Sequence, residues 1–406
     1  MLQAWFVVDH PLQLVDALYT AQFLRTSGFK VHLLVSLHPY WKQDYLTLCE
    51  EFFDSIHVYE RLAHEHAQYG IFYLLAVRRL QRSLCSLGIG EKDLIVSFMI
   101  CWTLENALIS LFKQNFKVLV LPEYRFSMDL EVNPDMHLHQ FVPGGEISYR
   151  MIEPLCGLYR TLYMQEKGTH SAVGTFVRYE SAIETLYNVT LLMYNHGQKK
   201  AEHLRSGIVA TSRPPYQKFY PVEKNNPEKK KIIVFGSGLF SVLTCQLTQT
   251  EHEISVLNHC LEYIRRNYQH RYHLIYRPHP IHRQEMECLN LDNFEIELDG
   301  AMAELYFLKE RAIIHQVFSM TSSTSVIAFN HGLNAYSFLK LFDFLGQEVH
   351  NLLELYQGVP SVFFITDLSR LPYPYPPVEI DEQFSIDMAH TLTQYQQYYT
   401  HLSHAI

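Results

Sequence analysis

The sequence lacks several features that would place it in a familiar class of proteins. Its 406 residues include only seven cysteines, an odd number without a Cys-x-x-Cys pair, which indicates free thiols in a reducing compartment. No apolar run reaches the roughly 18 residues that a membrane span requires, and the nearest candidate, 93–112, is interrupted by Glu105 and Asn106. Residues 1–8 carry neither a basic region nor a cleavage site, so we expect no signal peptide and a cytoplasmic location.

Common nucleotide-binding and metal-binding motifs are missing as well. The sequence contains no Gly-x-x-x-x-Gly-Lys phosphate loop, no Asp-x-Asp pair and no His-Glu-x-x-His motif, and its 23 histidines are scattered. We therefore expect no metal site. The net charge of −9 disfavours general nucleic-acid binding, because that task needs a dominant basic surface. One basic run, Lys224–Lys231, is either a solvated linker or a contact with an anionic membrane face.

Length and composition predict a folded chain of two domains. Hydrophobic residues make up 48% of the chain and charged residues 18%, and 406 residues exceed the size of one ordinary core. In the first half, continuous apolar segments alternate with helix-length segments, which is typical of a parallel sheet covered on both faces. The expected strands are 4–8, 30–35, 54–59, 93–98 and 116–121, and the expected helices include 12–24 and 67–87.

The second half repeats this alternation after a proline-containing segment. Residues 206–231 hold Pro214, Pro215, Pro221 and Pro227 and mark the connection between the domains. Strands are expected at 231–236, 272–276 and 311–318, and helices at 251–267, 301–310, from 323 onward and at 381–401. We therefore expect an N-terminal domain over 1–210, a linker over 211–230, a second doubly wound domain over 231–375 and a C-terminal helical segment, 376–406, that returns to the first domain.

Polar clusters follow five of the expected strands. Ligands of open parallel sheets bind beyond the carboxyl ends of the strands, so these clusters point to one built site. They are Asp9–Gln13, Pro122–Arg125, Gly236–Gly238, Arg277–Pro280 and Ser319–Ser325.

The hydroxyl-rich segment Ser319–Ser325 lies between an expected strand and an expected helix. Capping a helix requires one hydroxyl, whereas several hydroxyls around a helix start are suited to a phosphate. His279, held between two prolines, adds a group that can carry positive charge. The Gly236–Gly238 segment lacks the third glycine of a dinucleotide fingerprint, which argues against NAD and leaves either a tight turn or close approach to a ligand.

The order and placement of two short motifs resemble a known enzyme family. His279-Pro280 follows a strand of the second domain, and Ser322-Ser323 stands at a later helix start. In this respect the chain resembles the bacterial CMP-sialic-acid-dependent sialyltransferases of lipooligosaccharide and capsule synthesis, glycosyltransferase family 52 and its relatives. The resemblance implies a GT-B-like fold in which two Rossmann-like domains face each other across a cleft, the first on the acceptor side and the second binding the CMP-sugar.

Further motifs of this family match in part. Pro11–Gln13 fits the usual opening after the first strand, and Glu304 stands where the family tends to place a glutamate that holds the CMP ribose. The family's acidic pair followed by glycine is represented by Glu123, but Pro122 precedes it and Tyr124 replaces the glycine. This departure puts the assignment of the general base in doubt more than the fold.

The resemblance implies an inverting transfer of sialic acid from CMP-sialic acid to a sugar hydroxyl of a surface glycan or glycolipid, without a metal or a cofactor beyond the CMP-sugar. Its oxocarbenium-like transition state expels a phosphate anion, which needs hydrogen-bond donors or positive charge, and the acceptor needs a general base. Glu123 is the expected base and Asp9 the reserve, with His279 also catalytic. The expected donor-binding residues are Gly236, Ser237, Gly238, Arg277, His279, Pro280, Glu304, Ser322 and Ser323.

Other interpretations stay open for several of these residues. Arg277 and Arg125 are suited to the sialic acid carboxylate and equally to surface ion pairs. Glu123 and Asp9 also fit helix caps, and Glu304 fits a solvated helix face.

Two alternative functions also stay open. A transferase that uses CMP-Kdo or another CMP-nonulosonic acid needs nearly the same phosphate site. A non-catalytic nucleotide-binding partner in capsule assembly would account for the altered segment Pro122–Arg125. For each function, a peripheral contact with the inner membrane is compatible with the basic run Lys224–Lys231.

Overall fold

The computed structural model of the chain divides into two compact units. Internal contacts place Met1–Pro214 and Glu382–Ile406 in the first unit and Pro215–Asp381 in the second. The residues that the structure describes are 2–8, 11–37, 41–62, 70–98, 103–112, 115–121, 165–166, 169–170, 189–194, 208–211, 230–243, 246–279, 283–298, 302–322, 324–346, 349–350, 353, 356, 359–374 and 383–404.

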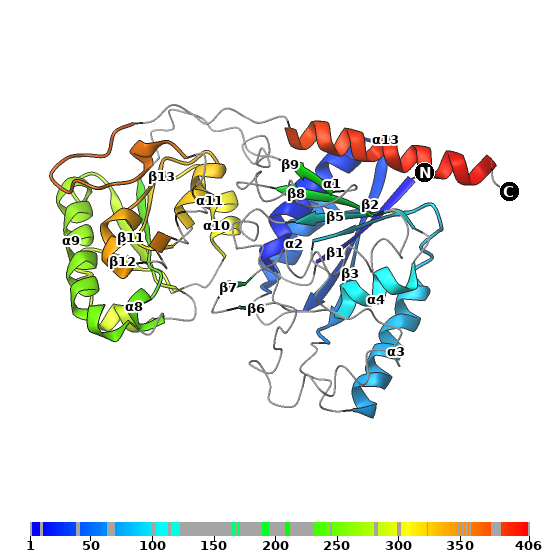
Figure 1. Cartoon of the computed structure of the whole chain (residues 1–406), viewed down its shortest axis with the longest axis horizontal. Coiled ribbons are helices and arrows are strands. Elements are labelled where there is room, and N and C mark those ends of the chain that lie inside the picture. Colours follow the sequence, from blue (N-terminus) through cyan, green and yellow to red (C-terminus); the bar gives the residue numbers. More distant parts are fainter. Residues whose placement is uncertain are drawn as a thin grey trace. The chain divides into compact units, whose positions relative to one another are not determined.

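The first unit is built on a seven-stranded sheet with the order β3-β2-β1-β4-β5-β8-β9, and all its strand pairs are parallel (Figure 1). Residues from Ala4 to Val8 are all buried, as expected for a strand covered on both faces. The strands are β1 (Leu2–Val8), β2 (Phe29–Leu37), β3 (Ser55–Glu60), β4 (Leu94–Ser97), β5 (Lys117–Leu121), β8 (Val189–Tyr194) and β9 (Ile208–Thr211), beside a separate antiparallel pair, β6 (Gln165–Glu166) and β7 (Thr169–His170).

Helices connect the strands of this sheet and cover it. They are α1 (Leu14–Thr26), which follows a short 3-10 turn (Pro11–Gln13), α2 (Gln43–Phe52), α3 (Ile71–Cys85) and α4 (Thr103–Leu111). The buried residues of α3 recur at helical spacing, so one face of this helix turns to the interior. There Tyr73, Val77 and Leu84 share a core cluster with Leu108 of α4 and Trp5 of β1.

The C-terminal helix α13 (Gln383–His404) returns to the first unit, as the sequence predicts. The hydroxyl of Tyr395 donates to the carbonyl of Lys92 at 2.7 Å, and that of Tyr399 donates to the carbonyl of Glu91 at 2.9 Å. The ring of Tyr395 also meets the ring of Phe116 edge to face. These contacts attach the helix to the loop before β4 and to the start of β5.

The second unit is built on a five-stranded sheet with the order β12-β11-β10-β13-β14, again with every pair parallel. Its strands are β10 (Lys231–Phe235), β11 (His273–Arg277), β12 (Glu295–Ile296), β13 (Ile314–Ser319) and β14 (Ala335–Ser337). The order is that of β3-β2-β1-β4-β5, in which the chain winds to one edge and then returns to the other side of its first strand. Two Rossmann-like doubly wound units are therefore confirmed, and the cleft between them stays a prediction.

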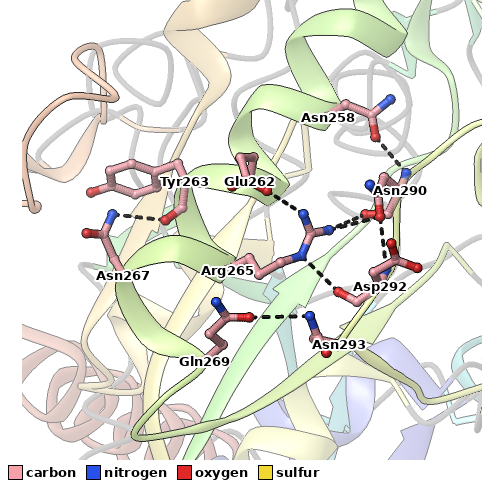
Figure 2. Close-up of polar contacts among 9 residues, drawn as sticks. All are labelled: Asn258, Glu262, Tyr263, Arg265, Asn267, Gln269, Asn290, Asp292 and Asn293. Atoms are coloured by element: carbon pink, nitrogen blue, oxygen red, sulfur yellow. Dashed lines mark hydrogen bonds and ion pairs between the residues drawn. The ribbon is translucent and has the colours of Figure 1, made fainter.

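Helix α9 (Thr250–Tyr268) buries one face in the core of the second unit and holds a loop with the other. Its residues Leu257, Leu261 and Ile264 are buried. On the outer face, Arg265 donates to the carbonyls of Asn290 and Asp292 at 2.8 and 2.9 Å (Figure 2). The remaining helices are α8 (Phe240–Leu243), α10 (Ala303–Glu310) and α11 (Thr324–Asn330), with 3-10 turns at Leu247–Gln249, Gln284–Glu287, Leu339–Leu345 and Ser361–Phe363.

Replacing Tyr395 with alanine should destabilise the first unit by about 3–5 kcal/mol, the usual cost of truncating a buried aromatic side chain. Tyr395 is 3% exposed and loses both its ring contacts and its hydrogen bond to Lys92 in this variant. Urea unfolding of the full chain measures the effect, with Gln397→Ala, an exposed position on the same helix, as the matched control. Equal unfolding midpoints for Tyr395→Ala and the control would contradict the packing described for α13.

Candidate functional site

The candidate site lies at the carboxyl edge of the second sheet. The strand order places β10 between β11 and β13. The chain leaves β10 toward β11 on one side and leaves β13 toward β14 on the other, so the switch point lies between β10 and β13. Such a switch point leaves a crevice beyond the strand ends, where ligands of doubly wound sheets bind. Neighbouring strands lie about 4.8 Å apart, so the ends of β11 and β13 are about 10 Å apart with the β10 loop between them.

Two hydrogen-bond contacts hold the β10 loop against its neighbours. The hydroxyl groups of Ser237 and Thr321 form a hydrogen bond, which joins the loop after β10 to the loop after β13. The backbone N–H of Gly236 donates to the carbonyl of Arg277 at 2.9 Å, which extends the pairing of β10 with β11 by one residue. Three predicted segments of the site are therefore adjacent.

The two positions of the β10 loop that glycine occupies require it for different physical reasons. A Cβ atom at Gly236 would collide with the hydroxyl of Tyr276 and lie 2.6 Å from Oε1 of Glu285. Gly238 has a φ of 78°, in the left-handed region that favours glycine. Internal packing and turn geometry thus explain both glycines, and the donor contacts predicted for Gly236, Ser237 and Gly238 stay a prediction.

Glu285 is a buried carboxylate that the sequence did not single out. It belongs to the 3-10 turn Gln284–Glu287, is 1% exposed, and accepts a hydrogen bond from the Tyr276 hydroxyl at 3.3 Å. Burial raises the pKa of its carboxyl, and interactions with the backbone N–H groups of Gly238 and His279 oppose that shift. One carboxylate therefore links the β10 loop to the β11 loop.

The hydroxyl-rich segment divides into internal and accessible groups. Ser319 is fully buried, and its hydroxyl donates to that of Ser325 at 2.5 Å. Thr321 is 3% exposed and already bonded to Ser237. Ser322 is half-buried, and its Oγ accepts the backbone N–H of Thr324 at 3.2 Å. The capping interpretation and a role in phosphate binding are thus compatible at Ser322, whereas the hydroxyls of Ser319 and Ser325 serve packing.

His279 and Arg277 have different surroundings although only Pro278 lies between them. His279 is half-buried after the end of β11. Arg277 is 4% exposed, its guanidinium stacks 3.9 Å from the ring centroid of Tyr306, and its Nε lies 3.7 Å from Oε2 of Glu297. Its contacts are internal and do not resemble the surface ion pair that the sequence left open. The predicted donor contact of Arg277 stays a prediction.

Glu304 lies in the first turn of α10, half-buried, and burial raises the pKa of its carboxyl. Because α10 begins after β12 ends, Glu304 belongs to the same edge of the sheet as the three loops. Other predicted residues lie outside the described part of the chain: Asp9, Glu123, Arg125, Pro280 and Ser323.

The first sheet has its own buried acid at the equivalent switch point. Glu105 of α4 is fully buried, hydrogen bonds with the Ser97 hydroxyl and accepts the backbone N–H of Phe98 at 2.9 Å. The sequence showed this residue only as an interruption of an apolar run. Its contacts stabilise the end of β4, which is the strand next to β1.

Among the described residues, no group of three or more His, Cys, Asp and Glu side chains is placed to hold a metal ion. None of the helices that the structure describes has the length and apolar character that crossing a membrane requires.

Comparisons with known proteins find similar solved structures, while no family model and no curated protein matches the chain. The chain is similar to the alpha/beta-galactoside alpha-2,3-sialyltransferase of Photobacterium phosphoreum, with 13% identity, 87% of this chain and 95% of that chain covered, and a TM-score of 0.48. It is also similar to the UDP-GlcNAc 2-epimerase of Neisseria meningitidis bound to UDP-GlcNAc, with 10% identity, 97% of this chain and 100% of that chain covered, and a TM-score of 0.43. A third similar structure is the S. aureus MnaA–UDP complex, with 9% identity, 91% of this chain and 94% of that chain covered, and a TM-score of 0.44. The functional assignment therefore rests on the residues of this chain.

The raised pKa of Glu285 predicts a pH dependence of stability. As pH rises above the ordinary glutamate value of 4.5, the unfolded chain ionises before the folded one. The folded state therefore loses stability between 4.5 and the raised pKa, and Glu285→Gln, which does not titrate, escapes this loss. Denaturant unfolding from acid to neutral pH should show wild-type stability falling relative to Glu285→Gln as pH rises. Glu287→Gln, exposed on the same turn, is the control, and identical pH profiles for wild type and Glu285→Gln would refute the assignment.

Proposed function

We propose that this chain is an inverting glycosyltransferase that moves a sialic acid from its CMP donor to a sugar hydroxyl of a surface glycan. The observation that carries the proposal is the placement of His279 and Ser322 on the two loops that flank the β10 loop at the switch point of the second sheet. Because the ends of β11 and β13 are about 10 Å apart, the two side chains can reach a phosphate from both sides. The motif order His279-Pro280 and Ser322-Ser323 adds support from the sequence.

The chemistry requires stabilisation of the leaving phosphate. The acceptor oxygen bonds to the anomeric carbon, the bond from that carbon to the phosphate oxygen breaks, and CMP leaves with the electron pair. Ser322 suits this step because its Oγ accepts the backbone N–H of Thr324 and shares a hydrogen bond of 2.7 Å with the Thr324 hydroxyl. When Thr324 is the donor of that second bond, the hydrogen of Ser322 is left to donate to a phosphate oxygen. A protonated His279 would add charge. Helix α11 has only seven residues, so we assign the main effect to side chains and not to the helix dipole.

A carboxylate from the first unit completes the mechanism by accepting the proton of the attacking hydroxyl. Glu123 is the proposed base and Asp9 the reserve, because each follows a strand of the first sheet at its carboxyl end. Glu105, the acid described at that edge, is fully buried and bonded to the backbone N–H of Phe98, which fits a structural role.

Two alternative functions differ from this proposal, one in the sugar that is transferred and the other in lacking catalysis. A CMP-Kdo transferase places the same demands on the phosphate site, since the leaving group is again CMP. A non-catalytic nucleotide-binding partner of capsule assembly is favoured by the segment Pro122–Arg125, where the family's glycine is replaced by Tyr124. Release of CMP from CMP-Neu5Ac and from CMP-Kdo, each with and without a glycan acceptor, separates these functions.

Replacing His279 with alanine should lower the transfer rate by about a hundredfold or more, the usual effect of losing one group that stabilises developing charge. The assay is CMP release from the active donor at saturating acceptor. His270→Ala, at an exposed position in the same unit, should keep the wild-type rate. A near-normal rate for His279→Ala would remove this residue from the phosphate site.

Replacing Glu123 with glutamine should abolish transfer while CMP binding, measured by calorimetry, stays unchanged. Glutamine keeps the size of the side chain and removes the basic lone pair, so only proton abstraction is lost. If Glu123→Gln still transfers and Asp9→Asn does not, Asp9 is the base. Full transfer by both variants would exclude both carboxylates.

A further inference from the structure

Helix α3 of the first unit exposes three large apolar side chains close to its N-terminal end. Ile71 is 66% exposed, Phe72 is 74% exposed and Leu75 is 49% exposed. Scattered apolar residues are normal on protein surfaces, but three within two helical turns form a local patch. Most of the helices and strands described in either unit expose fewer such residues.

The patch is not a core face that the fold left open. The opposite face of α3 is packed, because Tyr73, Val77 and Leu84 are buried in the core cluster of the first unit. Within that unit the helix also contacts α4 (Figure 1). The helix is thus fixed by one apolar face and presents a second one to the surroundings.

Basic side chains continue the exposed face toward the C-terminal end of the helix. Arg78, Arg79 and Arg82 are exposed, and α3 contains no aspartate or glutamate. The positions 71, 75, 78 and 82 follow helical spacing, so the apolar and basic residues share one stripe. Within the described part of the chain, neither Arg79 nor Arg82 pairs with a carboxylate. In a chain with a net charge of −9, this stripe is a local exception.

We infer that the exposed face of α3 docks the protein on an anionic lipid surface. An amphipathic helix with large apolar residues and arginines lies in the plane of a membrane, with its apolar side chains about 5–10 Å deep and its basic groups at the lipid phosphates. Lipid phosphates supply a negatively charged partner for Arg79 and Arg82, which pair with no carboxylate in the described part of the chain. A second copy of the chain would present the same arginines and bring like charges together.

This surface is separate from the basic run Lys224–Lys231, whose membrane contact stays a prediction. Lys231 of that run is half-buried and its Nζ pairs with Oε2 of Glu310 at 2.8 Å, while residues 224–229 lie outside the described part of the chain. Lys231 is therefore occupied within the second unit.

The position of α3 in the fold gives the docking a direction, a step that rests on the proposed function. In a β-α-β crossover the helix begins at the edge where the preceding strand ends, so the N-terminal end of α3 belongs to the carboxyl edge of the first sheet. A lipid surface at Ile71 and Phe72 therefore lies at the edge proposed to receive the acceptor. This arrangement suits a glycan acceptor that is attached to a lipid.

Co-sedimentation of the full chain with lipid vesicles tests the docking surface. The protein should bind vesicles of phosphatidylcholine and phosphatidylglycerol in equal parts, and bind pure phosphatidylcholine much more weakly. Phe72→Ser should lower the partition coefficient by about tenfold, and Arg79→Gln and Arg82→Gln by about fivefold each. Binding should also weaken as salt rises from about 0.1 M to about 1 M, where the screening length falls from about 10 Å to about 3 Å. Ile386→Ser, at a residue 58% exposed on α13, and Arg271→Gln, on the second unit, are the matched controls and should bind as the wild type does.

Three results would overturn the inference. One is equal binding to neutral and anionic vesicles, or none to either. Another is a loss of binding that is the same for Phe72→Ser and Ile386→Ser. The third is a wild-type dimer in sedimentation equilibrium that Phe72→Ser converts to a monomer, since the face would then join two copies. The vesicle assay needs neither donor nor acceptor, so its failure and a failure of glycosyl transfer are separate results.

Discussion

The buried carboxylate of Glu285 is the group on which the arrangement of the candidate site depends. It accepts a hydrogen bond from the Tyr276 hydroxyl at 3.3 Å and interacts with the backbone N–H groups of Gly238 and His279. The β10 loop lies directly against this carboxylate, so a Cβ atom at Gly236 would have no room beside it. The hydrogen bond between the hydroxyls of Ser237 and Thr321 connects the β10 loop to the β13 loop, so that His279 and Ser322 are positioned by internal contacts before any ligand binds.

Much of the architecture could be predicted from the sequence, because buried parallel strands are written as continuous apolar runs. The expected segment 231–236 became β10, and 251–267 became α9, with boundaries shifted by a residue or so. The short strands β12 and β14 were missed, since Glu295–Ile296 and Ala335–Ser337 are too short to form a recognisable pattern. The return of α13 followed from its place after a proline-rich break, and its tyrosine contacts with Lys92 and Glu91 give the physical reason.

The site could be predicted only as a set of strand ends. Sequence order places Ser319 and Ser322 in one hydroxyl-rich segment, but only the structure shows that the Ser319 hydroxyl donates a hydrogen bond to Ser325. Glu285 gave no signal, because a single acid in a polar loop has no pattern until its burial is known. The exposed face of α3 could not be predicted either. The sequence predicts a helix over 67–87 without indicating which apolar residues it exposes, and the structure shows that Ile71 and Phe72 are exposed.

A crystal structure of the chain with CMP tests the central claim most directly, namely that the carboxyl edge of the second sheet holds the phosphate of a CMP donor. The account predicts phosphate oxygens at hydrogen-bond distance, about 2.7–3.2 Å, from Oγ of Ser322 and from the imidazole of His279, above the loop Gly236–Gly238. A phosphate bound at another edge of either sheet, or a complex in which His279 and Ser322 contact no part of the nucleotide, would contradict it.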